Sequence, residues 1–276
     1  MSKRAFKTDE SFLEKISIGA IGTSKVFEDL KAKGHFPIEL ERGSMSFKIW
    51  KKIKIKRVRV PDILCINCGR RIESRAKTYL KITMSHSFSD AERGWDFGLD
   101  DTDLIALVKC IKSGDRPIDW EADELVQYVY VKDMRDAVRK KHVISEKPKG
   151  ATEGFEARLT WLSAVASSEG VVSKINKDFL KYKRTKDNRT IRLSLKRRGL
   201  TLVPLVKESS TVKKNQIIAS VVPVHDVPKC EKNLTERHYL SLIKSVSLSD
   251  RYTAAKALSY FESAESIESL FTLKHN

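Results

Sequence analysis

Apolar residues recur at helical spacing in a run near the N-terminus. Between residues 9 and 34 the apolar side chains recur every three or four positions, which predicts an amphipathic helix. Gly19 and Gly22 lie inside this run, and because glycine is a poor helix former they predict a break into two pieces. Gly34 follows the last apolar position and predicts the end of the second piece.

Short segments rich in apolar residues follow this helix and predict strands. Residues 36–40 and 47–49 are two of them, and residues 53–66 predict a long strand with a kink at a proline. An Asn-Cys-Gly sequence at 67–69 is a tight-turn signal. Residues 72–84 then alternate between apolar and polar side chains, as in a half-buried strand. Residues 53–84 therefore predict a β-hairpin.

The middle of the chain switches between helical and strand patterns. Residues 101–111 (DTDLIALVKCI) predict a capped amphipathic helix, although their continuous apolar centre also suits a strand. Residues 128–131 predict a strand and residues 132–141 a short basic helix. Residues 142–155 are polar, contain a proline and two glycines, and predict a linker.

Beyond the linker the pattern is again that of strands, and the end of the chain is helical. Strand patterns run through about 170–224, and helical spacing returns from about residue 233. We therefore expect an α+β protein in three parts: a first domain at 1–145, a β-rich domain at 156–228 and a helical segment at 233–276.

The amino-acid composition excludes several classes of protein. The chain has 276 residues, 41% of them hydrophobic, which is enough to bury a core. No apolar run approaches the roughly 18 residues of a membrane span, and the N-terminus lacks a signal-peptide core, so we expect no membrane association. Four cysteines do not make a disulfide scaffold, and we expect a cytoplasmic location.

The net charge is +17, and most of it lies in one stretch. Residues 42–81 hold thirteen Lys and Arg residues but only two acids, Asp62 and Glu73, and so carry +11 of the total. Such a basic stretch predicts a polyanionic partner, and we expect DNA. The residues expected to bind it are Lys51, Lys52, Lys54, Lys56, Arg57, Arg59, Arg70, Arg71 and Lys81.

The two isolated acids predict a catalytic metal site. Asp62 lies on the first predicted hairpin strand and Glu73 on the second, and carboxylates on adjacent strands can hold Mg²⁺ (or Mn²⁺). Lys77 projects from the same strand face as Glu73, where it can orient a water or stabilise charge on a phosphate oxygen. Hydrolysis of a phosphodiester bond needs these groups.

These residues resemble a known signature. Val-Pro-Asp-Ile at 60–63 followed by Ile-Glu-Ser-Arg-Ala-Lys at 72–77 is similar to the PD-(D/E)xK, or restriction-endonuclease-like, nuclease superfamily. In that family a helix precedes a hairpin with Asp on one strand and Glu-x-Lys on the next. The resemblance implies that Asp62 and Glu73 are metal ligands. Arg75 stands where the family has Lys, so the role of the lysine passes to Lys77 or Arg75.

In some members of that family a further acid assists the metal, and Glu39 or Glu41 is placed to do so. The expected function is a metal-dependent DNA endonuclease, in restriction or anti-phage defence. The alternative is a non-catalytic nucleic-acid-binding protein that uses the same basic hairpin. In that case Asp62 is a turn former, and Glu73 pairs with Arg57 or Arg75.

The two cysteines at the predicted hairpin tip, Cys65 and Cys68, form a C-x-x-C-G knuckle. Structural zinc needs four ligands, and no second C-x-x-C exists in the chain. His86, Cys110 or Cys230 can complete a site, but none has diagnostic spacing. We therefore interpret the pair as two buried thiols, with zinc at Cys65 and Cys68 as the alternative.

Two further resemblances concern the rest of the chain. Residues 202–206 (LVPLV) and 212–220 (VKKNQIIAS) are similar to the barrel-sandwich, or lipoyl-like, fold, without its carrier-lysine tripeptide. A basic loop at 181–198 suggests that this part also contacts DNA. Residues 249–260 resemble one helix of a HEAT-type repeat. Because a single repeat cannot bury its own apolar face, these helices pack on the body or meet a protein partner. A homodimer is the other assembly that the nuclease resemblance implies.

Overall fold

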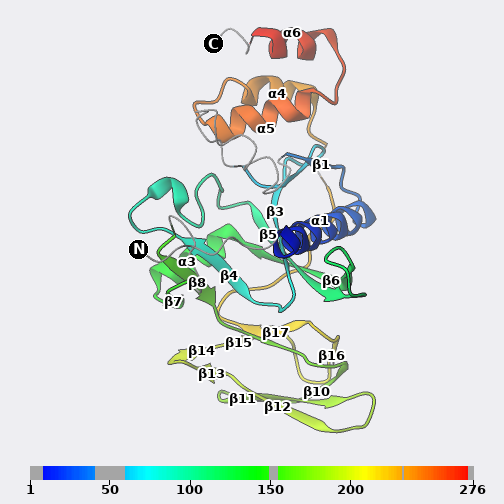
Figure 1. The fold of residues 1–276 in the computed structure, drawn as a ribbon, viewed down its shortest axis with the longest axis vertical. Helices are drawn as coiled ribbons and strands as arrows, with labels where there is room; N and C mark the ends of the chain where they lie inside the picture. The colour runs from blue at the N-terminus through cyan, green and yellow to red at the C-terminus, as the bar shows by residue number, and fades with distance from the viewer. Residues whose placement is uncertain (1–8, 41–59, 149–154, 232, 273–276) are drawn as a thin grey trace.

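The described chain is a mixed α+β structure. The computed structural model describes residues 9–40, 60–148, 155–231 and 233–272. Its parts are stacked along the long axis: the C-terminal helices at one end, a central sheet with a helix across it, and small sheets at the other end (Figure 1). None of the helices in these ranges is both long and apolar enough to cross a membrane.

A five-stranded sheet forms the centre of the molecule. Its strands, in spatial order, are β1 (Pro37–Glu39), β2 (Ile63–Cys65), β3 (Arg71–Lys77), β5 (Leu104–Lys112) and β6 (Trp120–Tyr130). The first three are antiparallel neighbours, β5 runs parallel to β3, and β6 is antiparallel to β5. The parallel pair of β3 and β5 lies inside the sheet, with a further strand on each side of it.

Helix α1 (Asp9–Ala32) crosses one face of this sheet without a break. The expected interruption at Gly19 and Gly22 is therefore wrong. Gly22 is used for packing instead: a Cβ at this position would lie 2.3 Å from the Cβ of Ala76 on β3. The helix backbone approaches the strand as closely as only glycine permits. Gly34, with φ +81°, follows the end of the helix as expected.

The segment at 101–111 is a strand, so the expectation of a capped helix there is wrong. Leu104 to Val108 are all buried, because β5 lies between two strands and has apolar clusters on both faces. Ala106 packs on the α1 side, whereas Ile105 and Leu107 belong to the cluster on the other side. A strand buried on both faces has the continuous apolar run that the sequence shows.

The predicted hairpin is shorter than expected. β3 ends at Lys77, and the chain turns into β4 (Ile82–His86), which joins a separate sheet of order β4-β8-β7. β8 (Ala157–Trp161) follows the expected linker at 142–155, but β7 (Ile144–Glu146) lies inside it, so residues 144–146 form a strand of this sheet and not a linker. The residues of the expected strand at 53–59, like the expected strand at 47–49, lie outside the described residues.

Residues of this second sheet pack in one apolar cluster with residues from both sides of the expected boundary between 145 and 156. Trp161 is fully buried against Trp95, with ring centroids 5.0 Å apart, and its indole N–H donates to Met134 O at 3.1 Å. Met134 lies in α3 (Val131–Arg139), the helix expected at 132–141. A short 3-10 helix, η1 (Ala91–Arg93), lies between β4 and β5.

The β-rich part is built from short strands around one core, in which Val172, Tyr182 and Ile218 are buried. Two sheets enclose it, of order β12-β11-β10-β16 and β15-β17-β9, and a two-stranded ladder pairs β13 with β14. Within the described residues these sheets do not close into a barrel. The strands are β9 (Ser163–Val165), β10 (Gly170–Ile175), β11 (Phe179–Arg184), β12 (Thr190–Ser194), β13 (Lys196–Arg197), β14 (Leu200–Thr201), β15 (Val203–Pro204), β16 (Thr211–Val212) and β17 (Ile217–Ser220).

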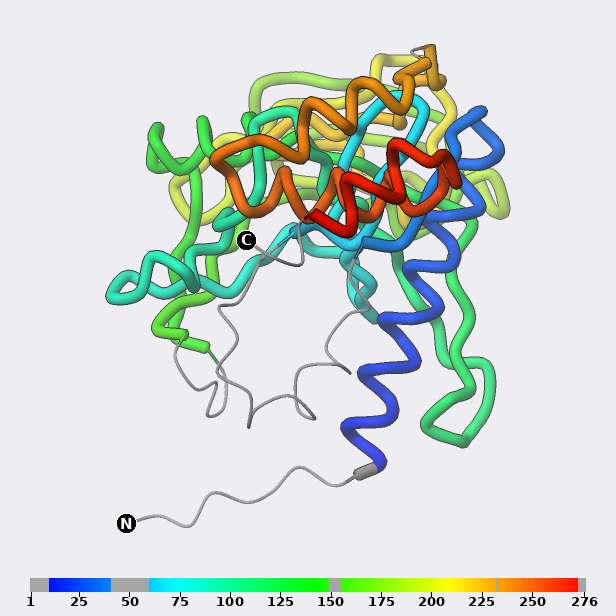
Figure 2. The backbone as a smooth tube through the Cα atoms, turned by 90° about the horizontal axis from the view of Figure 1, so that it is seen from above, coloured from blue at the N-terminus to red at the C-terminus, as the bar shows by residue number. Residues whose placement is uncertain are grey.

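Three helices end the described chain: α4 (Glu236–Leu242), α5 (Leu248–Leu258) and α6 (Ala264–Thr272). Viewed from the end of the molecule that carries these helices, α4 to α6 lie above the rest of the described chain, and α1 extends along one side (Figure 2). Tyr239 donates its hydroxyl hydrogen to Ile66 O at 2.6 Å, and Tyr252 donates to Leu40 O at 3.0 Å. The helices thus pack on the edge of the central sheet, one of the two placements expected for them.

The close approach of α1 to β3 predicts opposite effects for two neighbouring glycines. Gly22→Ala should lower the free energy of unfolding by about 1–3 kcal/mol, because the new methyl group meets Ala76. Gly19→Ala meets nothing within 4 Å and should raise it by up to about 1 kcal/mol, through helix propensity. Urea unfolding followed by circular dichroism measures both. Equal effects of the two variants would contradict the packing role of Gly22.

Candidate functional site

The two isolated acids lie near each other at the start of β2 and within β3. Ile63 pairs with Ile72 and Leu64 with Arg71, and Asp62 immediately precedes β2 while Glu73 follows Ile72. The Asp62 carboxylate also accepts the backbone N–H of Ser74 at 2.7 Å, which fixes it beside β3. The Asp62 carboxylate therefore lies beside the β3 backbone, and Glu73 lies on one face of that strand.

That face is the one turned away from α1. Ile63 and Ile72, which alternate with the two acids, both pack in the cluster beneath α1. Glu39 pairs with Ile63 and so lies on the α1 side, away from Asp62. Glu41, the other acid expected to assist a metal, lies outside the described residues.

Arg75 is the cation next to Glu73. Its Nη2 lies 2.6 Å from Glu73 Oε1, and the Glu73 side chain is only 15% exposed. Arg75 Nε is buried and has no hydrogen-bond partner among the described residues. The pair therefore combines a neutralised carboxylate with one unused, buried donor. The ion pair is also the contact that the non-catalytic alternative expects.

Lys77 points elsewhere. Its Nζ donates to Lys81 O at 3.1 Å and to Thr83 O at 2.9 Å, and it also contacts the Thr83 hydroxyl. Burial, assisted by the nearby charge of Arg75, lowers the pKa of Lys77 to about 7. The structure thus brings Arg75, and not Lys77, next to Glu73.

Arg71 was expected to contact nucleic acid, but the structure uses it internally. Its side chain is 6% exposed, and it forms two hydrogen bonds with Asp103, at 2.9 and 2.7 Å. It also contacts Asp100, and its Nη1 donates to Ser249 Oγ of α5 at 3.0 Å. Because these carboxylates neutralise the guanidinium, Arg71 has no exposed charge for a phosphate.

The other basic residues of the expected interface fall into two groups. Lys81 is exposed and Arg70 is half-buried, so both remain candidates for contact with a polyanion. Six of the expected contacts precede the described part of the hairpin and lie outside the described residues: Lys51, Lys52, Lys54, Lys56, Arg57 and Arg59.

A second basic surface lies on the hairpin of β11 and β12, within the basic loop expected at 181–198. Lys181 pairs directly with Arg192 across the two strands. Both cations lie over the ring of Phe179, with Lys181 Nζ at 5.0 Å and Arg192 Cζ at 4.4 Å from its centroid. The hairpin therefore presents an aromatic ring flanked by two cations, a combination that suits contact with bases and phosphates.

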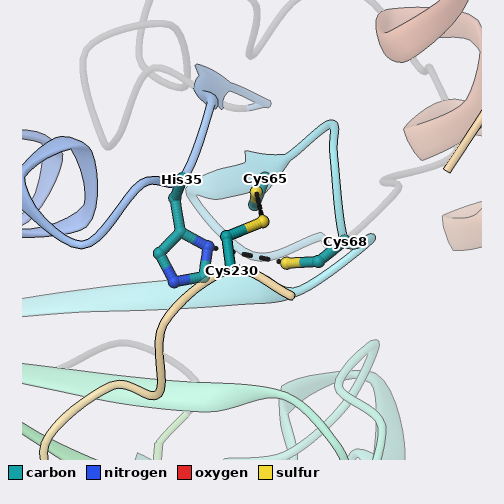
Figure 3. A group of neighbouring side chains, drawn as sticks. All are labelled: His35, Cys65, Cys68 and Cys230. Atoms are coloured by element: carbon teal, nitrogen blue, oxygen red, sulfur yellow. Dashed lines mark hydrogen bonds between the residues drawn. The ribbon is translucent and has the colours of Figure 1, made fainter. Parts of the chain in front are cut away.

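Four potential metal ligands lie close together at the β2–β3 hairpin. His35 follows α1, Cys65 ends β2, Cys68 lies in the turn after β2, and Cys230 comes from the segment before α4 (Figure 3). Their ligand atoms all lie within 4.8 Å of one another. Cys65 Sγ and Cys230 Sγ are 3.9 Å apart, and Cys68 Sγ is 3.5 Å from His35 Nδ1. We call this group the Cys3His cluster.

The local fold of the knuckle presents Cys65 and Cys68 together. Gly69 donates its N–H to Cys65 O at 2.8 Å, and Cys65 donates to Arg70 O at 2.8 Å. Gly69 has φ +70°, which closes the turn and favours glycine. A hydrogen bond from the Cys68 thiol lowers the pKa of Cys65, and the same contact raises the pKa of Cys68.

Sequence reasoning found only part of this cluster. The knuckle was recognised, and Cys230 was one of three residues considered to complete a site. The other two lie elsewhere: His86 Nδ1 accepts the backbone N–H of Trp95 at 3.2 Å, and Cys110 is buried near Ile18 O. His35 was missed, because its distance in sequence from the knuckle carries no spacing signal.

Comparisons of the chain with protein-family models, with curated proteins and with solved structures found no match. The function is therefore inferred from the acid pair, its neighbouring cations and the Cys3His cluster themselves.

The buried ammonium of Lys77 predicts a specific pH dependence of stability. Its pKa is about 7 in the folded chain, below the ordinary value of 10.5, so the unfolded chain binds more protons between these values. The free energy of unfolding, relative to that of Lys77→Met, should therefore rise by about 1 kcal/mol per pH unit between about pH 7.5 and 9.5. Urea titrations at several pH values measure the difference. Parallel curves for the two proteins would show that Lys77 is not perturbed.

Proposed function

We propose that the protein is a metal-dependent DNA endonuclease that binds Mg²⁺ or Mn²⁺ at Asp62 and Glu73. The observation that supports the proposal is that the Asp62 carboxylate accepts the backbone N–H of Ser74, the residue that follows Glu73 on β3. Oxygen ligands from carboxylates are what these hard cations prefer. Two protein ligands leave coordination positions for water and for a phosphate oxygen.

The order of elements also supports the proposal. An N-terminal helix followed by Asp on one strand and Glu-x-basic on the next is the arrangement that the PD-(D/E)xK resemblance implies. Here α1 packs across β3, Asp62 immediately precedes β2, and Glu73 and Arg75 lie within β3. Restriction or anti-phage defence is the setting that this resemblance favours.

The residues around the acids have distinct roles in this proposal. Asp62 and Glu73 would hold the divalent cation, which would supply a Lewis acid able to polarise a phosphate oxygen and to lower the pKa of a water. Asp62 is held in place by the Ser74 N–H, so its carboxylate is oriented before substrate arrives. Arg75 would place its guanidinium beside the metal and stabilise negative charge on the phosphate.

The competing proposal is a nucleic-acid-binding protein without catalysis. The observation that favours it is the ion pair between Glu73 and Arg75, which neutralises the acid without a metal. The basic surface around Phe179 would then be a binding site in its own right. The two proposals share a DNA partner and differ in whether the acid pair cleaves it.

Cleavage of supercoiled plasmid in Mg²⁺ or Mn²⁺ separates the two proposals. Asp62→Asn keeps an acceptor for the Ser74 N–H, and Glu73→Gln keeps an acceptor for Arg75, so both variants should fold. Each should cleave at least about 100-fold more slowly than wild type, since each loses a charged metal ligand. Glu28→Gln, an exposed acid-to-amide change on α1, is the matched control and should retain wild-type activity.

Substrates with modified bases belong in the same assay. Wild-type protein that binds DNA but leaves every substrate intact with both metals would favour the binding proposal. Cleavage by both amide variants at the wild-type rate would remove the acid pair from the mechanism.

The basic surface around Phe179 predicts a salt dependence of DNA binding. The logarithm of the binding constant should fall linearly with the logarithm of salt concentration, by about 0.9 for each phosphate neutralised. A double variant, Lys181→Gln with Arg192→Gln, should flatten this slope by roughly 2 if both cations contact phosphates. Fluorescence anisotropy with labelled duplex measures the slope, and Lys25→Gln on α1 is the control. An unchanged slope in the double variant would place the DNA elsewhere.

A further inference from the structure

The geometry of the Cys3His cluster matches that of a tetrahedral zinc centre. With Zn–S near 2.3 Å and Zn–N near 2.0–2.1 Å, two sulfurs around one zinc lie about 3.8 Å apart, and a sulfur and a nitrogen about 3.6 Å. The corresponding distances here are 3.9 Å between Cys65 Sγ and Cys230 Sγ, and 3.5 Å between Cys68 Sγ and His35 Nδ1. These two separations match those around a zinc ion, and all four ligand atoms lie within 4.8 Å of one another.

The imidazole of His35 is oriented as a metal ligand. Its Nε2 lies 2.8 Å from Pro228 O, and because a carbonyl oxygen only accepts, this nitrogen carries the proton. The lone pair of the ring is then on Nδ1, which faces Cys68 Sγ. A backbone carbonyl that fixes the second nitrogen is the usual support of a metal-bound histidine.

The ligand set selects both the metal and its role. Three thiolates with one imidazole suit zinc, whereas Mg²⁺ and Mn²⁺ prefer oxygen ligands such as those of Asp62 and Glu73. Four protein ligands leave no position for water or substrate, so a metal here is structural. The site is therefore distinct from the acid pair in chemistry as well as in residues.

The segment that carries Cys230 shows what a metal here would hold. Residues 225–231 run from the β-rich part toward α4, and we call them the connecting segment. His225 and Tyr128 exchange two backbone hydrogen bonds, at 2.9 and 2.8 Å, and Lys33 Nζ lies 2.7 Å from Asp226 Oδ1. Cys230 then donates its N–H to Lys33 O at 3.2 Å. The segment crosses the sheet at β6 and reaches the end of α1 beside the knuckle.

We propose that His35, Cys65, Cys68 and Cys230 bind one structural zinc ion, which fastens the connecting segment to the β2–β3 hairpin. Three thiols release their protons as the Zn–S bonds form. The site joins ligands 165 residues apart in sequence, where the chain alone provides little constraint. The ion holds α4 and α5 against β2, and thereby fixes the strand that follows Asp62.

The test begins with the metal content of the full chain, purified under reducing conditions without chelator. Mass spectrometry of metals should find one zinc per chain in wild type. Cys230→Ser and His35→Ala should lose most of it. Cys110→Ser is the matched control, because burial raises the pKa of this thiol to about 11 and it lies apart from the cluster; it should retain zinc.

A second measurement reports on ligand identity without relying on variants. Metal-free wild-type protein supplied with Co²⁺ should show the visible absorption of tetrahedral cobalt, with thiolate charge-transfer bands in the near ultraviolet. Folded wild-type protein that takes up neither zinc nor cobalt would overturn the proposal. Iron in place of zinc, or equal zinc in Cys230→Ser and Cys110→Ser, would also overturn it.

Proteolysis tests the fastening role. Lys229 is exposed and immediately precedes Cys230, so trypsin cleavage after it reports on opening of the connecting segment. Removal of zinc from wild type should accelerate this cleavage by about tenfold or more, and added zinc should reverse the effect. An unchanged rate would mean that the ion does not hold the segment. Neither readout depends on DNA cleavage, so failure of either proposal leaves the other standing.

Discussion

A buried arginine on β3 ties the parts of this fold together. A guanidinium removed from water is tolerated only where carboxylates and hydrogen bonds compensate it. Arg71 finds them in Asp103, which immediately precedes β5, in Asp100 of the same loop, and in Ser249 of α5. Because Asp103 is fixed to Arg71, Leu104 lies opposite Ile72, and the parallel register of β3 and β5 follows. Removal of Arg71, or of its carboxylate partners, would leave a buried charge unpaired. The strand β3, the loop before β5 and the helix α5 therefore assemble together.

Alternate side chains of β3 point to opposite faces of the sheet, and the two faces have different roles. Its residues on one face, including Ala76, meet α1, and the close approach there requires a glycine on the helix. Its residues on the other face include Glu73 and Arg75. Glu73 and Arg75 thus lie on a strand whose other face packs against α1, which is the support that a site of fixed geometry needs.

Local sequence patterns predicted the parts of this arrangement that depend on local physics. The alternation in β3, the turn at Cys68 and Gly69 and the helices α3 to α5 all follow from spacing within a few residues. The sequence at 101–111 predicts a helix because an acidic cap signal precedes it, with a strand as the alternative, and the burial of β5 on both faces depends on distant elements. The sequence predicts a helix break at Gly22, because its contact with Ala76 involves a residue far away along the chain. Cys230 is only one of three candidates to complete the site of the knuckle and His35 is not among them, because no sequence spacing links either residue to Cys65 and Cys68.

The C-terminal helices also constrain how the chain acquires its structure during synthesis. The apolar side chains of β1 and β2, among them Ile38 and Leu64, are covered by Tyr239, Ile243 and Leu258. These partners leave the ribosome roughly ten to thirty seconds after the hairpin, at ordinary rates of translation. The nascent strands must stay unaggregated over that interval with one face bare. A part of the chain that is made later therefore completes a core begun by strands made earlier.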